Sequence, residues 1–365
     1  MSLSRVGIVG AGQLGRMLAL AGYPLGVHCL FLDRDPQSPG GQVAPILTGD
    51  LEDPARLAQL AAQSQVVTFD WENIAGKALE PLEHLTLVRP PRAALEVSQD
   101  RLAEKALFTR LKIPVAAHLA VDSREDVILA ARRIGLPGVL KTRRLGYDGK
   151  GQFALKDEAD IDAAWSAMGA DGLIYERFQE FSREISIIGV RSASGRTAFY
   201  PLAANTHRGG ILRYSTAPFA HTLLERTARN YLQRILKALD YVGVLALEFF
   251  VVGGRLVANE MAPRVHNSGH WTIEGCVTSQ FENHLRAICD LPLGSTRALG
   301  HTAMINFLGK VPDRDALLGI EGLAFHDYGK QPRPGRKVGH CTILKKAAKD
   351  RNLALANALK FIEWT

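Results

Sequence analysis

The sequence lacks the long apolar runs, the paired cysteines and the internal repeats that mark several classes of protein. No stretch approaches about 20 consecutive apolar residues, so neither a transmembrane helix nor a membrane partner is expected. The first residues run directly into a strand-like segment, Val6–Val9, and do not predict a secretory signal. The four cysteines are scattered and form no CxxC pair, which favours reduced thiols in a cytoplasmic protein over a zinc site or a disulfide framework.

Large blocks of one charge are also absent. The 365 residues carry a net charge of +7, and the densest basic cluster, Arg333–Lys337, is short. This dispersal of basic residues argues against nucleic acid as a partner and fits anionic small molecules. With 47% hydrophobic and 22% charged residues, the composition is typical of a soluble globular protein of two or three domains.

The N-terminal part of the chain alternates predicted strands with predicted helices. Strands are expected at Arg5–Val9, Val27–Leu32 and Gln65–Phe69, and helices at Gln13–Ala21 and Pro54–Ala62. Such alternation predicts a parallel α/β sheet, which we place in a first domain of residues 1–92 that ends at a Pro-Pro pair.

Beyond this boundary the pattern changes to that of an α+β fold. Asp100 is a candidate N-cap for a helix that reaches Lys112. The further elements are strands Val139–Lys141, Leu173–Glu176, Glu184–Val190 and Thr197–Leu202, a helix Leu223–Leu239, and a hairpin of Val244–Val252 and Arg255–Glu260. We expect a central region of residues 93–290 and a small β-rich C-terminal domain of residues 291–365.

The first motif, Gly10-Ala11-Gly12-Gln13-Leu14-Gly15, satisfies G-x-G-x-x-G between a strand and a helix. Asp33 follows at the end of the second strand, which completes the fingerprint of a dinucleotide-binding turn. The glycines show only that the backbone approaches another group closely and that a helix N-terminus favours an anion. An NAD(P)-dependent oxidoreductase, a site for a different anion and a packed turn without a ligand therefore all stay open.

A second motif joins a strand-borne lysine to a basic, glycine-rich loop. Lys141 ends a predicted strand, and the loop Gly146–Gln152 carries three glycines beside Lys150. Backbone amides and lysine charge in such a loop hold phosphate oxygens, so we expect a lid over a nucleotide. A basic surface turn is the alternative.

Two carboxylates, Glu248 and Glu260, lie in the apolar strands of the predicted hairpin. A buried carboxylate is costly without a cation, and Mg²⁺ bridged to nucleotide phosphates is a natural one. A plain two-residue turn at Gly253-Gly254 would place the two on opposite faces, whereas one bulged residue beside the glycines would place them on the same face. Structural carboxylates paired with arginine are the alternative.

Two polar clusters complete the candidate site. Arg264–Trp271 combines a guanidinium, an imidazole, an amide and a hydroxyl without an apolar period, which favours a polar site beside the two carboxylates. Gly329–His340 is rich in proline, glycine and basic residues and predicts a loop. That loop is either a clamp for a phosphomonoester or a solvated basic loop.

Taken together, these segments resemble the N5-carboxyaminoimidazole ribonucleotide synthases, ATP-grasp enzymes of purine biosynthesis. The resemblance runs nearly end to end, through GAGQLGRML at the start, TFDWENI near residue 70, GYDGKGQ at 146–152, NTHRGGILRYS at 205–215, NEMAPRVHNSGHWT at 259–272, SQFENHLRAI at 279–288 and RPGRKVGH at 333–340. It implies an ATP-grasp fold with a Rossmann-like N-terminal domain. It also implies the carboxylation of 5-aminoimidazole ribonucleotide by bicarbonate, with ATP going to ADP and phosphate through carboxyphosphate. A homodimer is implied, as is Mg²⁺ with Mn²⁺ as a substitute.

The resemblance also assigns roles to residues. ATP contacts are implied for Arg101, Lys141, Gly146, Tyr147, Asp148, Gly149, Lys150, Gly151, Gln152, Glu176, Arg177, Phe178, Gln179, Glu184, His207, Asn259 and Glu260. Magnesium would lie on Glu248 and Glu260, and the ribonucleotide on Gln13, Glu72, Tyr147, Asp148, Lys330, Arg336 and Lys337. Catalytic roles fall on Asp148, which orients or deprotonates the amine, and on Arg264, His266, Asn267 and Ser268. At Asp70 the family usually has glutamate. The rival functions are the oxidoreductase and a nucleotide sensor without turnover.

Overall fold

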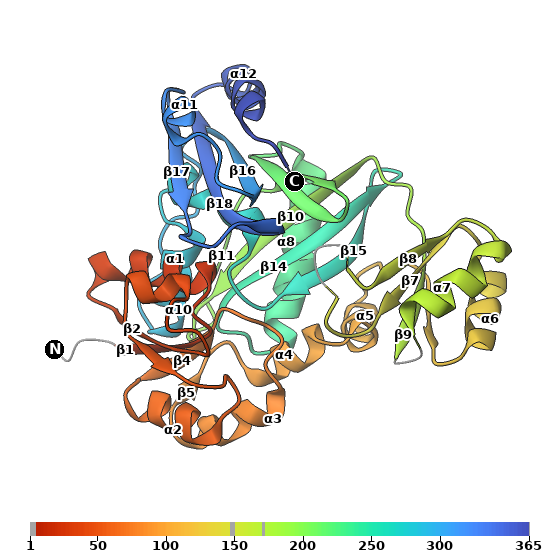
Figure 1. The fold of residues 1–365 in the computed structure, drawn as a ribbon, viewed down its shortest axis with the longest axis horizontal. Coiled ribbons are helices and arrows are strands. Elements are labelled where there is room, and N and C mark those ends of the chain that lie inside the picture. Colours follow the sequence, from red (N-terminus) through yellow and green to blue (C-terminus); the bar gives the residue numbers. More distant parts are fainter. Residues whose placement is uncertain (1–4, 147–149, 170–171, 365) are drawn as a thin grey trace.

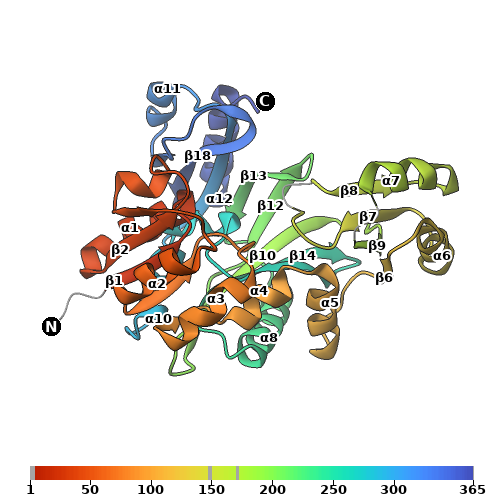
Figure 2. The ribbon, with the colours of Figure 1, turned by 60° about the horizontal axis from the view of Figure 1, so that its bottom comes forward.

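The computed structural model describes residues 5–146, 150–169 and 172–364, which form three β-sheets with helices packed on them (Figure 1). The N-terminal sheet and a small four-stranded sheet lie at opposite ends of the molecule in both views, with the largest sheet between them (Figure 2). No helix in this described part of the chain has the length and apolar character needed to cross a bilayer.

The N-terminal sheet is parallel, as predicted, with the strand order β3-β2-β1-β4-β5. Its strands are β1 (Arg5–Val9), β2 (His28–Asp33), β3 (Ile46–Thr48), β4 (Val66–Phe69) and β5 (Leu87–Val88). Its helices are α1 (Gln13–Gly22), α2 (Pro54–Ala62), α3 (Gly76–Leu79) and α4 (Arg92–Ser98). Alternate residues of β1 enter two different cores, because Val6 and Ile8 pack with α1 whereas Val9 packs with α2. Both faces of the sheet are therefore buried, which suits a parallel sheet.

The four-stranded sheet is antiparallel and has the order β6-β9-β7-β8. It consists of β6 (His118–Val121), β7 (Gly138–Thr142), β8 (Gln152–Leu155) and β9 (Leu173–Arg177), with α6 (Arg124–Ile134) and α7 (Ile161–Met168). Helix α5 (Arg101–Arg110) leads into this sheet. The side chain of Asp100 accepts the Leu102 amide at 2.9 Å, so the predicted N-cap is confirmed.

The largest sheet has nine strands in the order β15-β14-β10-β12-β13-β16-β18-β17, with β11 paired to β10. Its strands are β10 (Arg183–Arg191), β11 (Thr197–Phe199), β12 (Ala203–Arg208), β13 (Ile211–Ala217), β14 (Gly243–Val252), β15 (Arg255–Ala262), β16 (His301–Gly309), β17 (Leu323–Asp327) and β18 (Arg333–Lys345). The helices around it are α8 (Thr222–Ala238), α9 (Thr272–Gly275), α10 (Gln280–Ile288), α11 (Arg314–Leu318) and α12 (Ala348–Ala358). Short 3₁₀ helices lie at Tyr23–Leu25, Pro39–Gln42, Glu80–His84, Glu158–Asp160, Asn267–Gly269 and Leu359–Phe361.

Because β16 pairs with β13, the C-terminal strands continue the central sheet. The domain boundary placed at residues 290/291 therefore falls inside the span of one sheet, and both domain boundaries remain predictions.

Two predicted elements are wrong in extent by three residues or more, while others differ by one or two residues at their ends. The expected strand Thr197–Leu202 ends at Phe199, and the expected loop Gly329–His340 becomes strand β18 from Arg333 onward. Pro334 fits in the strand because the ladder is bulged: Leu308 pairs with Lys337, whereas the next residue of β16, Gly309, pairs with Arg333. The three residues between these pairs leave the ladder, so a proline there removes no ladder hydrogen bond.

Candidate active site

Two adjoining cavities lie where the three sheets meet. The larger, of about 980 Å³, is lined by the glycine turn, the segment around Glu72, the loop after β15 and the start of β18. The smaller, of about 580 Å³, lies between the four-stranded sheet and the hairpin β14–β15. Arg101, Lys150 and Glu260 line both cavities. Molecules bound in the two cavities would therefore share contacts with these three side chains.

The smaller cavity collects most of the residues expected to bind ATP. Its lining includes Arg101, Lys141, Lys150, Gly151, Gln152, Glu176, Arg177, Phe178, Gln179, Glu184, His207, Asn259 and Glu260. Gly146 lines the larger cavity instead. Tyr147, Asp148 and Gly149 lie outside the described residues.

The predicted strand-borne Lys141 is held by a buried carboxylate. Its Nζ lies 3.0 Å from Glu176 Oε2, and a second lysine, Lys105, lies 3.2 Å from Glu176 Oε1. Burial alone would raise the pKa of Glu176, but Lys141 and Lys105 outweigh it and lower that pKa to about 2. The carboxylate is thus ionised and fixes the lysine ammonium at the cavity wall. Lys105, only 1% exposed, escaped the sequence analysis, although its i+4 spacing from Arg101 on one helix face was a usable signal.

The two hairpin carboxylates lie directly opposite each other on one face. The turn is the plain two-residue turn, with Val252 opposite Arg255, and the register shifts between Glu248 and Phe249 so that Glu248 pairs with Glu260. The expected bulge therefore exists, but Asn259 forms it, and it does not lie beside the glycine pair. A bulge at this point turns Glu260 to the face that carries Glu248.

Glu248 is a buried carboxylate whose negative charge is poorly compensated. Its Oε1 is buried and has no hydrogen-bond partner, and its pKa is raised to about 7 by burial, with His207 opposing and Glu260 adding to the rise. Glu260 also pairs with Arg101 at 3.3 Å. Within the described ranges no three His, Cys, Asp or Glu side chains form a metal site on their own. A two-carboxylate site suits Mg²⁺, which usually completes its coordination with water and phosphate oxygens.

In the larger cavity, the predicted Arg264 is tied to the predicted Glu72. The guanidinium forms a bidentate pair with the carboxylate, with Nη2 2.5 Å from Oε1 and Nε bonded to Oε2. Burial raises the pKa of Glu72, but the charge and hydrogen bonds of Arg264 lower it, and the pKa is lowered overall. Glu72 thus orients Arg264, in addition to any contact with a ribonucleotide.

His266 presents a neutral imidazole to the same cavity. The Ser268 amide donates to Nδ1 at 3.3 Å and the Ser268 hydroxyl lies 2.9 Å from the same atom. Burial, with the nearby Arg264, holds the pKa of His266 well below its usual value, so Nε2 carries the single ring proton. Asn267 is bonded to Asn306 at 2.9 and 2.7 Å. Ser268 is buried and lines neither cavity, which places it behind His266.

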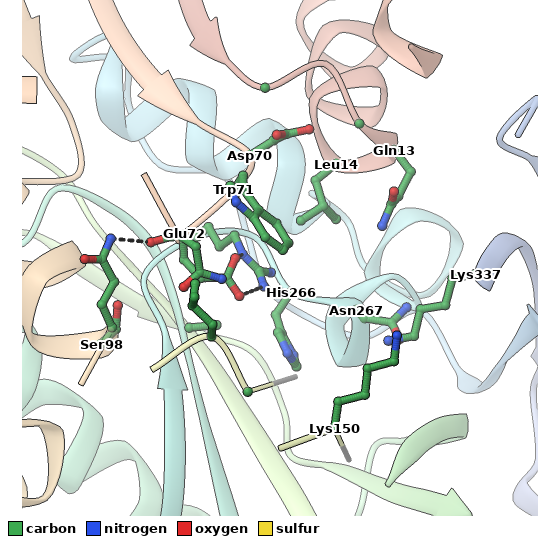
Figure 3. A pocket seen from close by; sticks show the side chains of 18 of the residues that line it. Gln13, Leu14, Asp70, Trp71, Glu72, Ser98, Lys150, His266, Asn267 and Lys337 are labelled. Carbon is green, nitrogen blue, oxygen red and sulfur yellow. Dashed lines mark hydrogen bonds and ion pairs between the residues drawn. The ribbon is translucent and has the colours of Figure 1, made fainter. Parts of the chain in front are cut away.

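Basic side chains form one wall of the larger cavity, where Lys330, Arg333, Arg336 and Lys337 gather. Lys330 Nζ donates to Gln13 Oε1, so the segment just before β18 meets the start of α1. Burial and then Arg336 lower the pKa of Lys330 to about 8. Figure 3 shows Asn267, Lys337 and Lys150 converging on one side of this cavity, with Gln13 above them. The substrate residues predicted among the described positions therefore meet in one place.

The glycine turn already holds carboxylates. Gly15 N donates to Asp70 Oδ2 at 3.1 Å, and Ala11 N donates to Asp33 Oδ2 at 2.7 Å. A Cβ at Gly10 would overlap Asp70 Oδ1, so this glycine, at φ 93°, makes room for the carboxylate. Burial raises the pKa of Asp70 to about 6, against the hydrogen bonds from Gly15 and Gly12. In a dinucleotide-binding turn such amides bind the pyrophosphate. Here the amides of Ala11 and Gly15 already bind the carboxylates of Asp33 and Asp70.

Three family models match successive parts of the chain. They are the ribonucleotide synthetase preATP-grasp domain over residues 3–99, the ATP-grasp domain over 106–281, and the phosphoribosylaminoimidazole carboxylase C-terminal domain over 302–352. The N5-carboxyaminoimidazole ribonucleotide synthase of Pseudomonas aeruginosa is 48% identical over 93% of this chain and 94% of its own length. The chain belongs to the N5-carboxyaminoimidazole ribonucleotide synthase family. Its predicted ATP-grasp fold is confirmed.

Solved structures of this family superpose closely on the chain. The Thermus thermophilus enzyme has a TM-score of 0.95 at 49% identity, with 99% of both chains covered. An Aspergillus clavatus N5-carboxyaminoimidazole synthase, solved in complex with ADP and 5-aminoimidazole ribonucleotide, has a TM-score of 0.93 at 29% identity, with 99% of both chains covered. The family resemblance of the sequence is therefore matched by the whole fold.

Several polar residues of this synthase site were not found from the sequence. Glu104 is 2% exposed, lines the larger cavity and accepts the Met261 amide at 2.7 Å; burial raises its pKa to about 8. Asp70 was noticed only as a departure from the family pattern. No local pattern marks such residues, because their partners lie far away in the sequence.

Proposed function

We propose that the chain is an ATP-dependent ligase that joins bicarbonate to the amine of 5-aminoimidazole ribonucleotide, giving N5-carboxyaminoimidazole ribonucleotide, ADP and phosphate. The observation that carries this proposal is the meeting of two cavities at Glu260, which lies opposite Glu248 in the hairpin. One cavity has the lysine and carboxylates of a nucleotide site, and the other has a basic wall suited to a phosphomonoester. The names of the relatives point to the same reaction in purine biosynthesis.

Activation of bicarbonate is the first task of such a site. Bicarbonate is a poor electrophile, so its oxygen takes the terminal phosphoryl group of ATP to form carboxyphosphate. Phosphoryl transfer depends on charge neutralisation and alignment. Lys141, fixed by Glu176, is placed to neutralise phosphate oxygens, and Arg101 lies at the border between the cavities.

Magnesium belongs to this proposal as the ion that the two hairpin carboxylates would hold with the phosphates. The buried, unbonded Oε1 of Glu248 is a ready ligand atom, and Glu260 lies across the ladder from it. When bound, the ion would neutralise and align the phosphoryl group that is transferred. Arg101 already compensates part of the Glu260 charge, so Glu248 is the carboxylate with the stronger need for the ion.

The bicarbonate itself would lie against Arg264, His266 and Asn267. These residues offer a guanidinium, a ring N–H and an amide to the larger cavity, a donor set that suits a planar oxyanion. Because His266 Nδ1 accepts from Ser268, the ring acts as a hydrogen-bond donor through Nε2 and holds its proton. The role of Asp148 in orienting or deprotonating the amine rests on the family resemblance alone.

The ribonucleotide would place its phosphate on Lys330, Arg336 and Lys337 and contact Gln13. Asp33 and Asp70 occupy amides of the glycine turn, which disfavours a second phosphate there and therefore a dinucleotide. The oxidoreductase alternative loses its main support for this reason. A homodimer is also part of the proposal, on the family resemblance, and equilibrium sedimentation checks it.

Oxygen transfer tests the proposed chemistry. With ¹⁸O-labelled bicarbonate, unlabelled ATP and the ribonucleotide, each phosphate released should carry one ¹⁸O atom, because the bicarbonate oxygen stays on phosphorus when the amine attacks the carbonyl carbon. Mass spectrometry of the phosphate, taken before bicarbonate exchanges with water, reads this out. Unlabelled phosphate formed together with carboxylated product would rule out carboxyphosphate.

A further inference from the structure

The loop that carries Arg264, His266 and Asn267 has little regular structure to hold it. Only the 3₁₀ turn Asn267–Gly269 interrupts an otherwise irregular path between β15 and α9. Side chains on such a loop keep a fixed direction only if other groups bind its main chain. The shape of the loop therefore depends on what contacts the backbone at His266.

Gln280, the first residue of α10, binds both main-chain polar groups of His266. The His266 amide donates to Gln280 Oε1 at 3.0 Å, and Gln280 Nε2 donates to the His266 carbonyl at 2.7 Å. This pair of bonds assigns the two ends of the amide side chain, because one end must accept and the other must donate. Gln280 is 0% exposed and lines neither cavity, so it touches no substrate.

The grip of Gln280 is itself rigid. The main-chain amide of Gln280 donates to Thr272 Oγ1 at 3.0 Å. The Thr272 hydroxyl in turn donates to the carbonyl of Gly269, at the other end of the loop, at 2.7 Å. A Cβ at Gly269 would lie 2.6 Å from Gln280 Oε1, so the glycine makes room for the side chain. One glutamine therefore connects the loop at His266 and Gly269 to the end of a helix that packs on α1 and β14.

The backbone grip has a direct effect on the imidazole. With the main chain of His266 fixed, the Ser268 amide can reach Nδ1, and this leaves the ring proton on Nε2 of a side chain that lines the larger cavity. A shift of the main chain would move this donor and its neighbours Arg264 and Asn267 together. A misplacement of about 1 Å costs on the order of 10²-fold in rate.

We propose that Gln280 is a positioning residue that holds the Arg264–Asn267 loop in the shape needed to bind and align bicarbonate. The inference rests on the proposed function of that loop. Gln280 acts through His266 and makes no contact with the reacting atoms. No residue of this loop lines the nucleotide cavity, although His266 Nδ1 lies 3.6 Å from Glu248 Oε1, so loss of the grip should change ATP binding far less than the use of bicarbonate.

Gln280→Glu tests the proposal, since it keeps the size and the acceptor but turns the donor toward the His266 carbonyl into a second acceptor. Its kcat/KM for bicarbonate should fall on the order of 10²-fold, while the KM for ATP stays within about twofold. Gln280→Met, which removes both polar ends, should behave in the same way. The matched control on the same helix is Glu282→Gln, which weakens the ion pair between Glu282 Oε1 and Arg286 Nη2 (2.5 Å). This variant should keep the wild-type kcat and KM values.

A purely structural role would lower the melting temperature and leave the constants of the folded fraction unchanged. Wild-type kcat/KM for bicarbonate in Gln280→Glu, or a rise in the KM for ATP as large as the loss for bicarbonate, overturns the inference. Should neither variant fold, amide hydrogen exchange on the intact wild-type protein decides: slow exchange at His266 supports the grip, and unprotected exchange overturns it. A wild-type protein that consumes no ATP with bicarbonate and the ribonucleotide would instead contradict the proposed function.

Discussion

Lys330 gives the sharpest test of the basic wall, because its charge should be lost within an accessible pH range. Its pKa is lowered to about 8 by burial and by Arg336, with Lys337 and Arg333 adding to the repulsion. A bound phosphate would stabilise the ammonium and raise this pKa. In the free enzyme Lys330 is therefore charged below about pH 8 and neutral above it, whereas in the complex it stays charged.

This difference predicts a specific pH profile. The kcat/KM for the ribonucleotide reports groups of the free enzyme, so it should fall about tenfold for each pH unit above the Lys330 pKa, while kcat stays level over the same range. The substrate phosphate, with a second pKa of about 6, is a dianion throughout and adds no break. The kcat/KM for ATP, measured with the ribonucleotide saturating, should show no matching fall.

The control variant is Lys330→Arg, whose guanidinium keeps its charge across this range. It should abolish the break near pH 8. The variant is needed because Glu104, which lines the same cavity, also has a pKa of about 8. If the break persists unchanged in Lys330→Arg, or appears equally in kcat of the wild type, Lys330 does not bind the substrate phosphate as proposed.

Three other outcomes follow from the site. Glu248→Gln should abolish ADP formation without lowering the melting temperature, because it removes a buried carboxylate whose charge is disfavoured; residual Mg²⁺-dependent turnover near the wild-type rate would contradict the metal assignment. Arg336→Ala should raise the KM for the ribonucleotide by about one to two decades, with kcat and the KM for ATP nearly unchanged; an unchanged ribonucleotide KM would mean that the phosphate lies elsewhere. Calorimetric titration with NAD or NADP should give no binding heat, and tight binding would show that Asp70 does not close the glycine turn.

The local elements of this fold were largely predictable, because each has its own pattern. The strand Arg5–Val9 and the helix Pro54–Ala62 match the prediction residue for residue, and Asp100 caps its helix as expected. The sequence predicted that Glu248 and Glu260 share a face only if the hairpin contains a bulge. The position of the bulge at Asn259 was not predictable, since register is decided by the whole ladder.

Long-range pairing accounts for what the sequence did not show. Nothing local predicts that Tyr214 of β13 pairs with Ile305 of β16, so the continuity of the central sheet was missed. Strand β18 was hidden by Pro334 and Gly335, which leave the ladder in a bulge. The buried polar residue Gln280 has its role only through His266, which lies outside the local pattern of its helix, and the sequence alone carries no sign of that role.

The central claim is that ATP is consumed to join bicarbonate to the ribonucleotide amine, and phosphate release from ATP measures it directly. With Mg²⁺ present, release should be slow with either co-substrate alone and should rise strongly when bicarbonate and 5-aminoimidazole ribonucleotide are supplied together, one phosphate for each carboxylated product. A rate that is the same with and without the ribonucleotide, or no release at all, would contradict the account.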